Sequence, residues 1–236
     1  MPRVRVVLVR PETPANVGAA ARAIRNTGLD ALALVAPGDW RTVECWRTAW
    51  GAHDVLEQAA VSPDLGDALA DAGYAAAFSG RGFRGEPVQD VREMAAEMAT
   101  LAPGERAALV FGPETSGLTQ AEMALCGRVV RIPTHPDQPS LNLSHAVMVA
   151  AYEVHRASRR ASTAPRRATH GEKEGMLALL FEGLRSIEAL PQRQAEERFL
   201  EWRAMFERAD LTPKEVRLLG HMARKMTGRG RPETPG

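Results

Sequence analysis

The sequence predicts an α/β fold, a parallel Rossmann-like sheet domain followed by a small α-helical extension. Two observations predict the sheet domain: short apolar runs of strand length alternate with amphipathic helical segments, and the alternation continues to about residue 156. A third observation predicts the extension, because the segments after a basic stretch are typical of helices alone. We therefore expect a sheet domain over residues 1–156, a basic linker over 157–171, and a helical domain with a disordered tail over 172–236.

Five apolar runs bounded by proline, glycine or charged residues are typical of buried parallel strands. They are Val4–Val9, Ala31–Ala36, Tyr74–Phe78, Ala107–Phe111 and Arg128–Ile132. Helices are expected to connect them: Asn16–Thr27, Val43–Trp50, Asp64–Asp71, Val91–Leu101, Gln120–Cys126 and Ser144–Ser158. Ligands of such sheets bind at the carboxyl ends of the strands, so functional residues are expected there.

The extension is predicted to hold three helices. The first two cover Glu172–Leu190 and Gln192–Arg208. The third begins after Thr212, which has the type of an N-cap residue, and Glu215 is placed to close a capping box with it.

Composition excludes several classes of protein. The chain has 236 residues of which 44% are apolar, so it can bury a core, and its 30 basic and 29 acidic residues leave any nucleic-acid surface to local clustering. Cys45 and Cys126 are far apart without a C-x-x-C pair, which argues against a disulfide framework or a zinc ribbon and favours a reducing compartment. No run approaches the roughly 18 apolar residues of a membrane span. We therefore expect a cytoplasmic protein without a membrane anchor.

The first candidate motif follows the first predicted strand. Asn16 can cap the helix, Gly18 allows another backbone or a ligand to come close, and Arg22 lies off the apolar stripe. Taken alone, this segment is more typical of a capped helix with a solvated arginine than of a functional site.

The second candidate motif is the segment from Ala108 to Thr119. Gly112 and Gly117 flank Glu114 at the carboxyl end of a predicted strand, which places a carboxylate and free backbone N–H groups where α/β folds bind ligands. An ordinary strand-to-helix connection is the alternative. The spacing does not match a nucleophile elbow, so Ser116 is not expected to be a nucleophile.

The third candidate motif opens the helix predicted after Ile132. Ser140, Leu141, Asn142 and Ser144 precede a segment that is apolar nearly all round, so the helix is predicted to be buried and its first N–H groups are available to a ligand. Capping explains one of these polar residues and not all of them.

Two other patterns are not interpreted as the binding sites that they first suggest. Gly80, Gly82 and Gly85 match G-x-G-x-x-G, but Pro87 follows closely and favours extended backbone, so a dinucleotide fingerprint is rejected. The six histidines show no metal-ligand spacing, and no metal site is expected.

Together the three motifs resemble the ordered motifs of the SpoU-type RNA 2′-O-ribose methyltransferases of the SPOUT class. The matching residues are Pro14, Asn16, Gly18, Arg22, Phe111, Gly112, Glu114, Gly117, Leu118, Ile132, Pro133 and Ser140 to Ser144. The resemblance covers about residues 1–156. The apolar strand before the first motif and the helical extension are most similar to the TrmJ-type tRNA methyltransferases.

The resemblance implies a trefoil knot in the sheet domain, S-adenosylmethionine as cofactor, and a homodimer in which Arg22 of one subunit faces the cofactor of the other. It implies a catalytic set of Arg22, Asn16, Glu114 and Asn142. The cofactor loops it implies contain Phe78, Ser79, Gly80, Gly112, Ile132, Ser140, Leu141 and Asn142.

The implied reaction is methylation of a ribose 2′-hydroxyl in RNA without a metal, in the tRNA anticodon loop at a cytidine or uridine in position 32. The rival interpretations are an rRNA methyltransferase of the same family and a catalytically silent RNA-binding module. RNA contacts are predicted from Arg22 and from the basic linker, at Arg156, Arg159, Arg160, Arg166 and Arg167. A solvated hinge is the alternative for the linker.

Overall fold

A parallel sheet of seven strands forms the centre of the computed structural model, which describes residues 2–80, 82, 87–158, 166–190 and 195–228. The strand order is β3-β2-β1-β6-β4-β7-β5, and every neighbouring pair is parallel. The strands are β1 (Arg3–Val9), β2 (Ala31–Val35), β3 (Ala60–Ser62), β4 (Tyr74–Phe78), β5 (Gln89–Asp90), β6 (Arg106–Phe111) and β7 (Gly127–Arg131). The predicted α/β class and the five central strands are confirmed, and the short edge strands β3 and β5 were not predicted.

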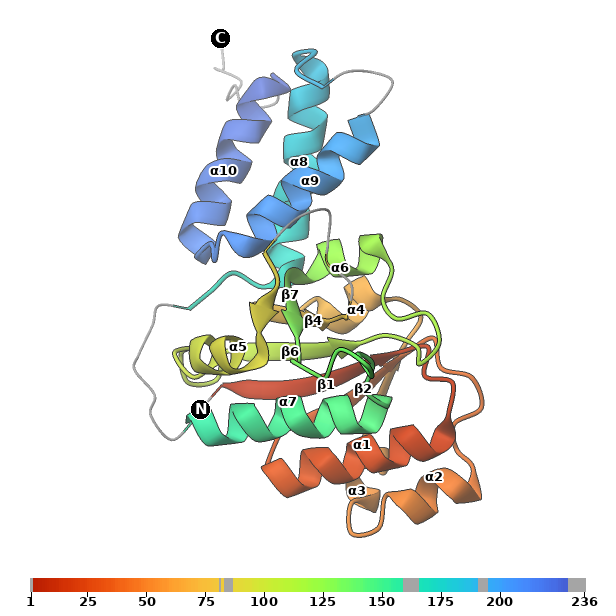
Figure 1. The fold of residues 1–236 in the computed structure, drawn as a ribbon. Coiled ribbons are helices and arrows are strands. Elements are labelled where there is room, and N and C mark those ends of the chain that lie inside the picture. Colours follow the sequence, from red (N-terminus) through yellow and green to blue (C-terminus); the bar gives the residue numbers. More distant parts are fainter. Residues whose placement is uncertain (1, 81, 83–86, 159–165, 191–194, 229–236) are drawn as a thin grey trace.

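Helices cover both faces of the sheet (Figure 1). One face carries α1 (Pro14–Thr27), α2 (Val43–Thr48), α3 (His53–Glu57), α5 (Val91–Met98) and α7 (Leu143–Ala157), and the other carries α4 (Leu65–Leu69) and α6 (Gln120–Cys126). The pleat of β1 sends Val6 and Leu8 into the first layer and Val7 and Val9 into the second, and all four are fully buried. The central strands are therefore apolar on both faces.

The start of α1 differs from the prediction. The helix begins at Pro14 with Thr13 in the N-cap position, so Asn16 is the third helical residue and the prediction that it caps the helix is wrong. Proline suits the first helical position because it lacks the N–H that would be unpaired there. The side chain of Asn16 is thereby free to bond outside its own helix.

The burial predicted for α7 is correct on one side only. Val147, Ala150 and Val154 are buried against the sheet layer and α1, whereas Met148 is half-buried and Tyr152 is 55% exposed. The segment is apolar on nearly all sides, but only one side of α7 is buried, because the helix lies in an outer layer of this chain.

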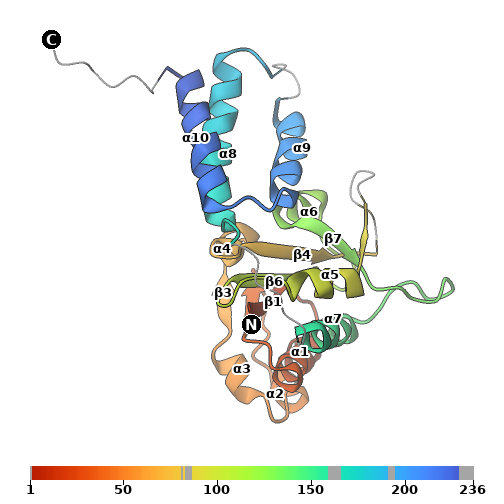
Figure 2. The same ribbon diagram turned by 90° about the vertical axis from the view of Figure 1, so that its left-hand side faces the viewer.

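Three helices form a separate layer beyond α4 and α6, which we call the helical unit (Figure 2). They are α8 (His170–Ser186), α9 (Ala195–Arg208) and α10 (Pro213–Met226). Leu180, Phe199 and Val216 belong to their small apolar core. The predicted capping box of α10 is confirmed, because Thr212 and Glu215 exchange side-chain bonds with each other's backbone N–H groups.

The helical unit has a buried cluster of charges between α8 and α9 and a close backbone contact with the sheet domain. Lys173 and His170 contact the two oxygens of Glu207 at 2.5 Å and 3.2 Å, and all three residues are buried. A Cβ on Gly127, at the start of β7, would lie 2.2 Å from Cβ of Glu207. Gly127 has φ 72°, a conformation that glycine adopts without strain. The two parts of the chain thus meet without room for a side chain at this point.

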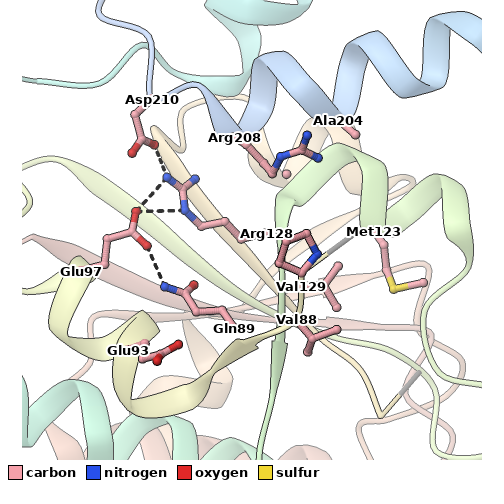
Figure 3. A pocket seen from close by; sticks show the side chains of 12 residues that line it. Val88, Gln89, Glu93, Glu97, Met123, Arg128, Val129, Ala204, Arg208 and Asp210 are labelled. Carbon is pink, nitrogen blue, oxygen red and sulfur yellow. Dashed lines mark hydrogen bonds and ion pairs between the residues drawn. The ribbon is translucent and has the colours of Figure 1, made fainter. Parts of the chain in front are cut away.

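A second polar cluster joins the same two parts (Figure 3). Arg128 of β7 bonds Glu97 of α5 and Asp210 of the helical unit, and its guanidinium lies over the ring of Tyr74. Arg128, Glu97 and Asp210 border a cavity of about 390 Å³ between β7, α5, α6 and α9. The negative carboxylates and the ring raise the pKa of Arg128 above its usual value despite its desolvation, so it stays charged.

No helix among the described residues has the length and apolarity that crossing a bilayer requires. The knot implied by the resemblance and the boundaries expected for the linker stay predictions. Residues 159–165 of the linker and 229–236 of the tail lie outside the described residues.

Candidate active site

Hydrogen bonds join the three sequence motifs in a single chain of side chains. The Asn16 amide nitrogen donates to the Glu114 carboxylate at 2.8 Å, and the Asn142 amide nitrogen donates to the Asn16 oxygen at 3.0 Å. These residues are about a hundred positions apart in sequence, and Asn16 is buried. The motifs therefore converge, as the resemblance implies.

The Glu114 carboxylate is held by three donors. Besides Asn16, the backbone N–H groups of Glu12 and Thr13 donate to it at 2.9 Å and 3.1 Å. Burial raises the pKa of Glu114, but the hydrogen bonds from Asn16 and from these backbone groups outweigh burial and leave the pKa below its usual value. Glu114 is therefore ionised at neutral pH and serves as an acceptor.

Two glycines shape the loop that carries Glu114. A Cβ on Gly112 would lie 2.4 Å from the backbone of Gly117 and Leu118, so the loop folds back on itself only with glycine there. Gly117 has φ 65°. Thr115 of the same loop donates to the Glu12 carboxylate at 2.5 Å, which the sequence did not reveal. The loop after β6 is thus tied to the loop after β1.

Asn142 fixes the start of α7 while it bonds Asn16. It is the N-cap residue, and its side-chain oxygen accepts the N–H of Ser144 at 2.9 Å and that of His145 at 3.4 Å. Ser144 also donates its hydroxyl to the same oxygen at 2.7 Å. Both ends of the Asn142 amide are therefore occupied, one locally and one by the first motif.

The loops expected to bind the cofactor leave three neighbouring strands. β6, β4 and β7 are adjacent, so Gly112, Ser79 and Ile132, which follow them, emerge at the same edge of the sheet. Phe78 and Phe111, the last residues of β4 and β6, stack with ring centroids 4.4 Å apart. The stacked rings fix the distance between the starts of the loops that follow β4 and β6.

The loop after β4 is hydrogen-bonded to β7 and leaves space beside Gly80. Ser79 donates its N–H to Val130 at 3.0 Å, and a Cβ added to Gly80 would meet no atom within 4 Å. Arg131 donates to the Gly80 carbonyl at 2.9 Å, a contact that sequence reasoning missed although Arg131 ends β7 at this edge. Arg131 thus links the loops after β4 and β7.

Residues of the third loop are accessible. Ser140 and Leu141 are exposed just before the Asn142 cap, and Ile132 is half-buried. Together with Gly80 they offer backbone groups and small or apolar side chains without a charge. Such a surface fits a neutral, planar ligand edge.

Arg22 does not join this cluster within one chain. It is exposed on α1, six positions after Asn16. This step turns it about 120° away from Asn16 and moves it about 9 Å along the helix axis. Both polar atoms of the Asn16 amide are already bonded to Glu114 and Asn142. Asn16 therefore does not orient Arg22 of the same subunit.

The arginines expected to bind RNA differ in availability. Arg156 and Arg166 are exposed but pair with Glu153 and Glu172 at 3.5 Å and 2.9 Å. Arg159 and Arg160 lie outside the described residues.

Arg167 is not available to a phosphate in this structure. It is buried between Asp210, Glu97 and Glu105 and lies over the Tyr74 ring. We expected Arg167 to contact RNA because the basic run around it is typical of a solvated linker. In the structure, carboxylates distant in sequence neutralise its charge.

One group of metal-ligand residue types occurs among the described residues. Ligand atoms of His170, Glu174 and Glu207 lie within 4.8 Å of one another. Lys173 and Arg203 already pair with the two carboxylates at 2.5 Å and 2.6 Å. The group therefore joins α8 to α9 within the helical unit.

Comparison with known proteins gives concordant matches. The profile of the SpoU rRNA Methylase family matches residues 3–152. A tRNA (cytidine/uridine/adenosine-2′-O-)-methyltransferase TrmJ of Pseudomonas aeruginosa is 40% identical over 177 residues, which cover 74% of this chain and 69% of that protein.

Solved structures share the fold. The crystal structure of TrmJ from Z. mobilis ZM4 has a TM-score of 0.83 and 31% identity, and the match covers 94% of this chain and 98% of that one. The SpoU methyltransferase AviRb from Streptomyces viridochromogenes, solved with its cofactor AdoMet, has a TM-score of 0.52 at 23% identity, covering 64% of this chain and 59% of that one. The first of these matches includes the helical unit.

Proposed function

The chain belongs to the SpoU methylase family, and from this premise we propose that it transfers a methyl group from S-adenosylmethionine to a ribose 2′-hydroxyl of tRNA. The observation that carries the proposal is the hydrogen-bonded chain Glu114–Asn16–Asn142, which brings the three motifs to the carboxyl edge of the sheet. The TrmJ relatives favour tRNA as the substrate. We propose the anticodon loop, at a cytidine or uridine in position 32, and a cytoplasmic location.

The residues at the strand ends fit this cofactor. We propose that the backbone of Ser79 and Gly80, together with Ile132 and Leu141, holds the adenine and ribose, because these residues carry no charge and there is space beside Gly80. Gly112, Phe78, Ser140 and Asn142 complete the predicted pocket. When bound, S-adenosylmethionine supplies a sulfonium-activated methyl group.

The protein's part in the reaction is then to align the 2′-hydroxyl and to stabilise the charge that develops on it. Alignment alone can supply roughly 7–11 kcal/mol. A guanidinium stays protonated in proteins, so we propose that Arg22 binds the adjacent phosphate and the developing alkoxide and is not a base. Asn16, Glu114 and Asn142 position the loops, because their polar groups are bonded to one another.

We propose that the protein acts as a homodimer in which Arg22 of the partner subunit completes the site. The exposure of Arg22 and its turn away from Asn16 support this arrangement. The test mixes an Arg22→Ala protein with an Asn142→Ala protein. Shared sites predict that an equal mixture regains activity at about a quarter of its sites, whereas each variant alone is inactive. A mixture as inactive as its components would contradict the shared site.

Substrate and position are tested together by mapping 2′-O-methyl groups in RNA from cells with and without the gene. The proposal expects loss of one methyl group from tRNA anticodon loops. Loss of a methyl group from rRNA instead would favour the second candidate, an rRNA methyltransferase. The name of the SpoU rRNA Methylase family supports this candidate. If the purified protein has no measurable affinity for S-adenosylmethionine, the result would favour a catalytically silent RNA-binding module.

The role of Arg22 is tested with a neighbour as control. We expect Arg22→Ala to abolish turnover with unchanged cofactor affinity, while Arg25→Ala, at an exposed position of the same helix, retains activity. Full turnover by Arg22→Ala would remove Arg22 from the mechanism.

A further inference from the structure

Three tryptophans lie in the segment from β2 to α3, and one of them is left in solvent. Trp40 is buried, with the guanidinium of Arg41 5.0 Å from its ring centroid. Trp46 is half-buried, with its ring centroid 5.6 Å from that of His53. Trp50, just after α2, is 73% exposed, and its side chain has no hydrogen-bond or ring partner within the described part of the chain. Tryptophan is a highly buried residue type on average, so this exposure calls for a ligand.

The packing of α2 on α1 places Trp50 beside the first motif. A Cβ on Gly18 would lie 2.1 Å from the Cys45 carbonyl oxygen and 2.2 Å from the Thr48 hydroxyl oxygen, so the two helices touch there. That hydroxyl oxygen is also 3.0 Å from the carbonyl oxygen of Ala15, in the first turn of α1. Trp50 comes two residues after Thr48. It therefore lies near the first turns of α1, which begins at the carboxyl edge of the sheet (Figure 1).

Two arginines near this position have no ion-pair partner. Arg22 is one turn after Gly18, so it lies about 40° round α1 and about 6 Å along its axis from the contact with α2. Arg47 is in the last turn of α2. Both are exposed and unpaired among the described residues, whereas Arg25 of α1 pairs with Asp54. The exposed ring thus has cations near it on both helices.

A ring and unpaired guanidinium groups together fit single-stranded RNA. A nucleobase stacks on an aromatic ring, and the phosphates of the same strand are bound by cations. Stacking requires a base whose face is free, which the loop of a hairpin offers and its paired stem does not. The surface therefore fits a nucleotide in a loop.

Two other occupants fit this surface less well. If a second copy of the chain packed the same patch on itself across a two-fold axis, guanidinium would face guanidinium. A membrane would require a continuous apolar face. Val43 and Trp50 are the exposed apolar side chains here, and the exposed residues between them include Glu44 and Arg47.

We propose that Trp50 stacks on an unpaired nucleobase of the RNA substrate, next to the nucleotide whose ribose is methylated. The inference rests on the proposed function, since that function supplies the RNA. Trp50 accompanies Arg22 of its own subunit to the site that Arg22 completes. It is a positioning residue, which selects an unpaired loop over a duplex and holds that loop for the reaction. The RNA-binding surface then includes α2, which lies outside the three motifs.

The test measures binding of, and methyl transfer to, an isolated anticodon stem-loop. Trp50→Ala removes the ring, Trp50→Phe keeps a smaller ring, and Val61→Ala is the control, at an exposed apolar residue of the edge strand β3. We expect Trp50→Ala to bind the stem-loop roughly 5- to 150-fold more weakly. KM should rise by a similar factor with kcat and cofactor affinity unchanged, because the stacked base is not the reacting group.

The two other variants separate stacking from a general effect of substitution. Trp50→Phe should recover most of the lost affinity, because phenylalanine also offers a ring face. Val61→Ala should bind as the wild type does. All three variants should unfold at the wild-type temperature, since both positions are exposed.

Two further readouts would not respond to a merely structural role. Trp50→Ala removes no charge, so its binding should keep the wild-type dependence on salt, whereas Arg47→Gln should lower the salt slope by about 1. An abasic residue is also placed in turn at each loop position of the RNA. At the stacked position it should weaken binding to the wild type and leave binding to Trp50→Ala unchanged, because the two changes remove the same contact.

Wild-type affinity of Trp50→Ala for the stem-loop would overturn the inference. So would a Trp50→Phe protein as weak as Trp50→Ala, or abasic residues that weaken both proteins equally at every position. If the wild type is a dimer in sedimentation and Trp50→Ala is a monomer, the ring belongs to a contact between subunits and the inference is wrong. A wild-type protein that methylates no tRNA refutes the proposed function instead, which is a distinguishable outcome.

Discussion

Replacing Asn16 with alanine tests whether the three motifs are joined by the hydrogen bonds described above. The variant removes a bond to the ionised Glu114 and a bond from Asn142 at a buried position. A bond to a charged group contributes about 1.5–3 kcal/mol and a neutral bond about 0.5–1.5 kcal/mol. Alanine regains about 0.6 kcal/mol of helix propensity. The expected net loss is about 1.5–4 kcal/mol.

The measurement is thermal and urea unfolding of the intact chain. For a protein of this size the expected loss corresponds to a fall in Tm of roughly 3–15 °C. Asn26→Ala is the matched control, because Asn26 is an exposed residue of the same helix. It should unfold at or slightly above the wild-type temperature. If Asn16→Ala unfolds together with Asn26→Ala, the bonds do not stabilise the site and the reasoning is refuted.

Three further outcomes are expected. Gly127→Ala should destabilise the protein by roughly 2–4 kcal/mol in urea unfolding, because φ 72° is strained for alanine and its Cβ would overlap Glu207, whereas Gly175→Ala, with open space around it, should not destabilise. Burial raises the pKa of Glu207, but its bonds to His170 and Lys173 outweigh burial and lower it. This carboxylate therefore stabilises the fold above its unfolded pKa of about 4.5, and the stability is lost as pH falls from there through the folded pKa. Urea midpoints that do not fall between about pH 5 and pH 3 would argue against this. Burial raises the pKa of Cys45 to about 11 and also raises that of Cys126, so neither thiol should react with a thiol reagent at pH 8 until the chain is unfolded; rapid reaction of the native protein would contradict their burial.

The sequence predicted what local patterns encode. Buried parallel strands are continuous apolar runs, so the five central strands were found within one residue of their observed ends. The cap of α10 was found because Thr212 and Glu215 satisfy each other's backbone within four residues. The strands β3 and β5 were missed because three and two residues at the sheet edge carry no such run.

The candidate site was predictable in its residues and not in its bonds. Glycines around Glu114 and the polar start of α7 marked the loops, since parallel strands end at one edge. That Asn16 lies inside the helix and bridges Glu114 to Asn142 depends on residues about a hundred positions away. Arg167 shows the same limit, because its burial is set by Tyr74 and Asp210 and not by the basic run around it.

The docking of the helical unit on β7 also has a consequence for biogenesis. Arg128 leaves the ribosome 82 residues before its partner Asp210, and Gly127 is likewise made long before Glu207. At about 5–20 residues per second, translation leaves a delay of roughly 4–16 s in which Arg128 has Glu97 but lacks Asp210 as a partner and the apolar side of β7 and α6 is uncovered. The protein therefore completes its fold only when its carboxyl-terminal helices have been made, and a chain that stops before α9 would leave the apolar side of β7 and α6 uncovered.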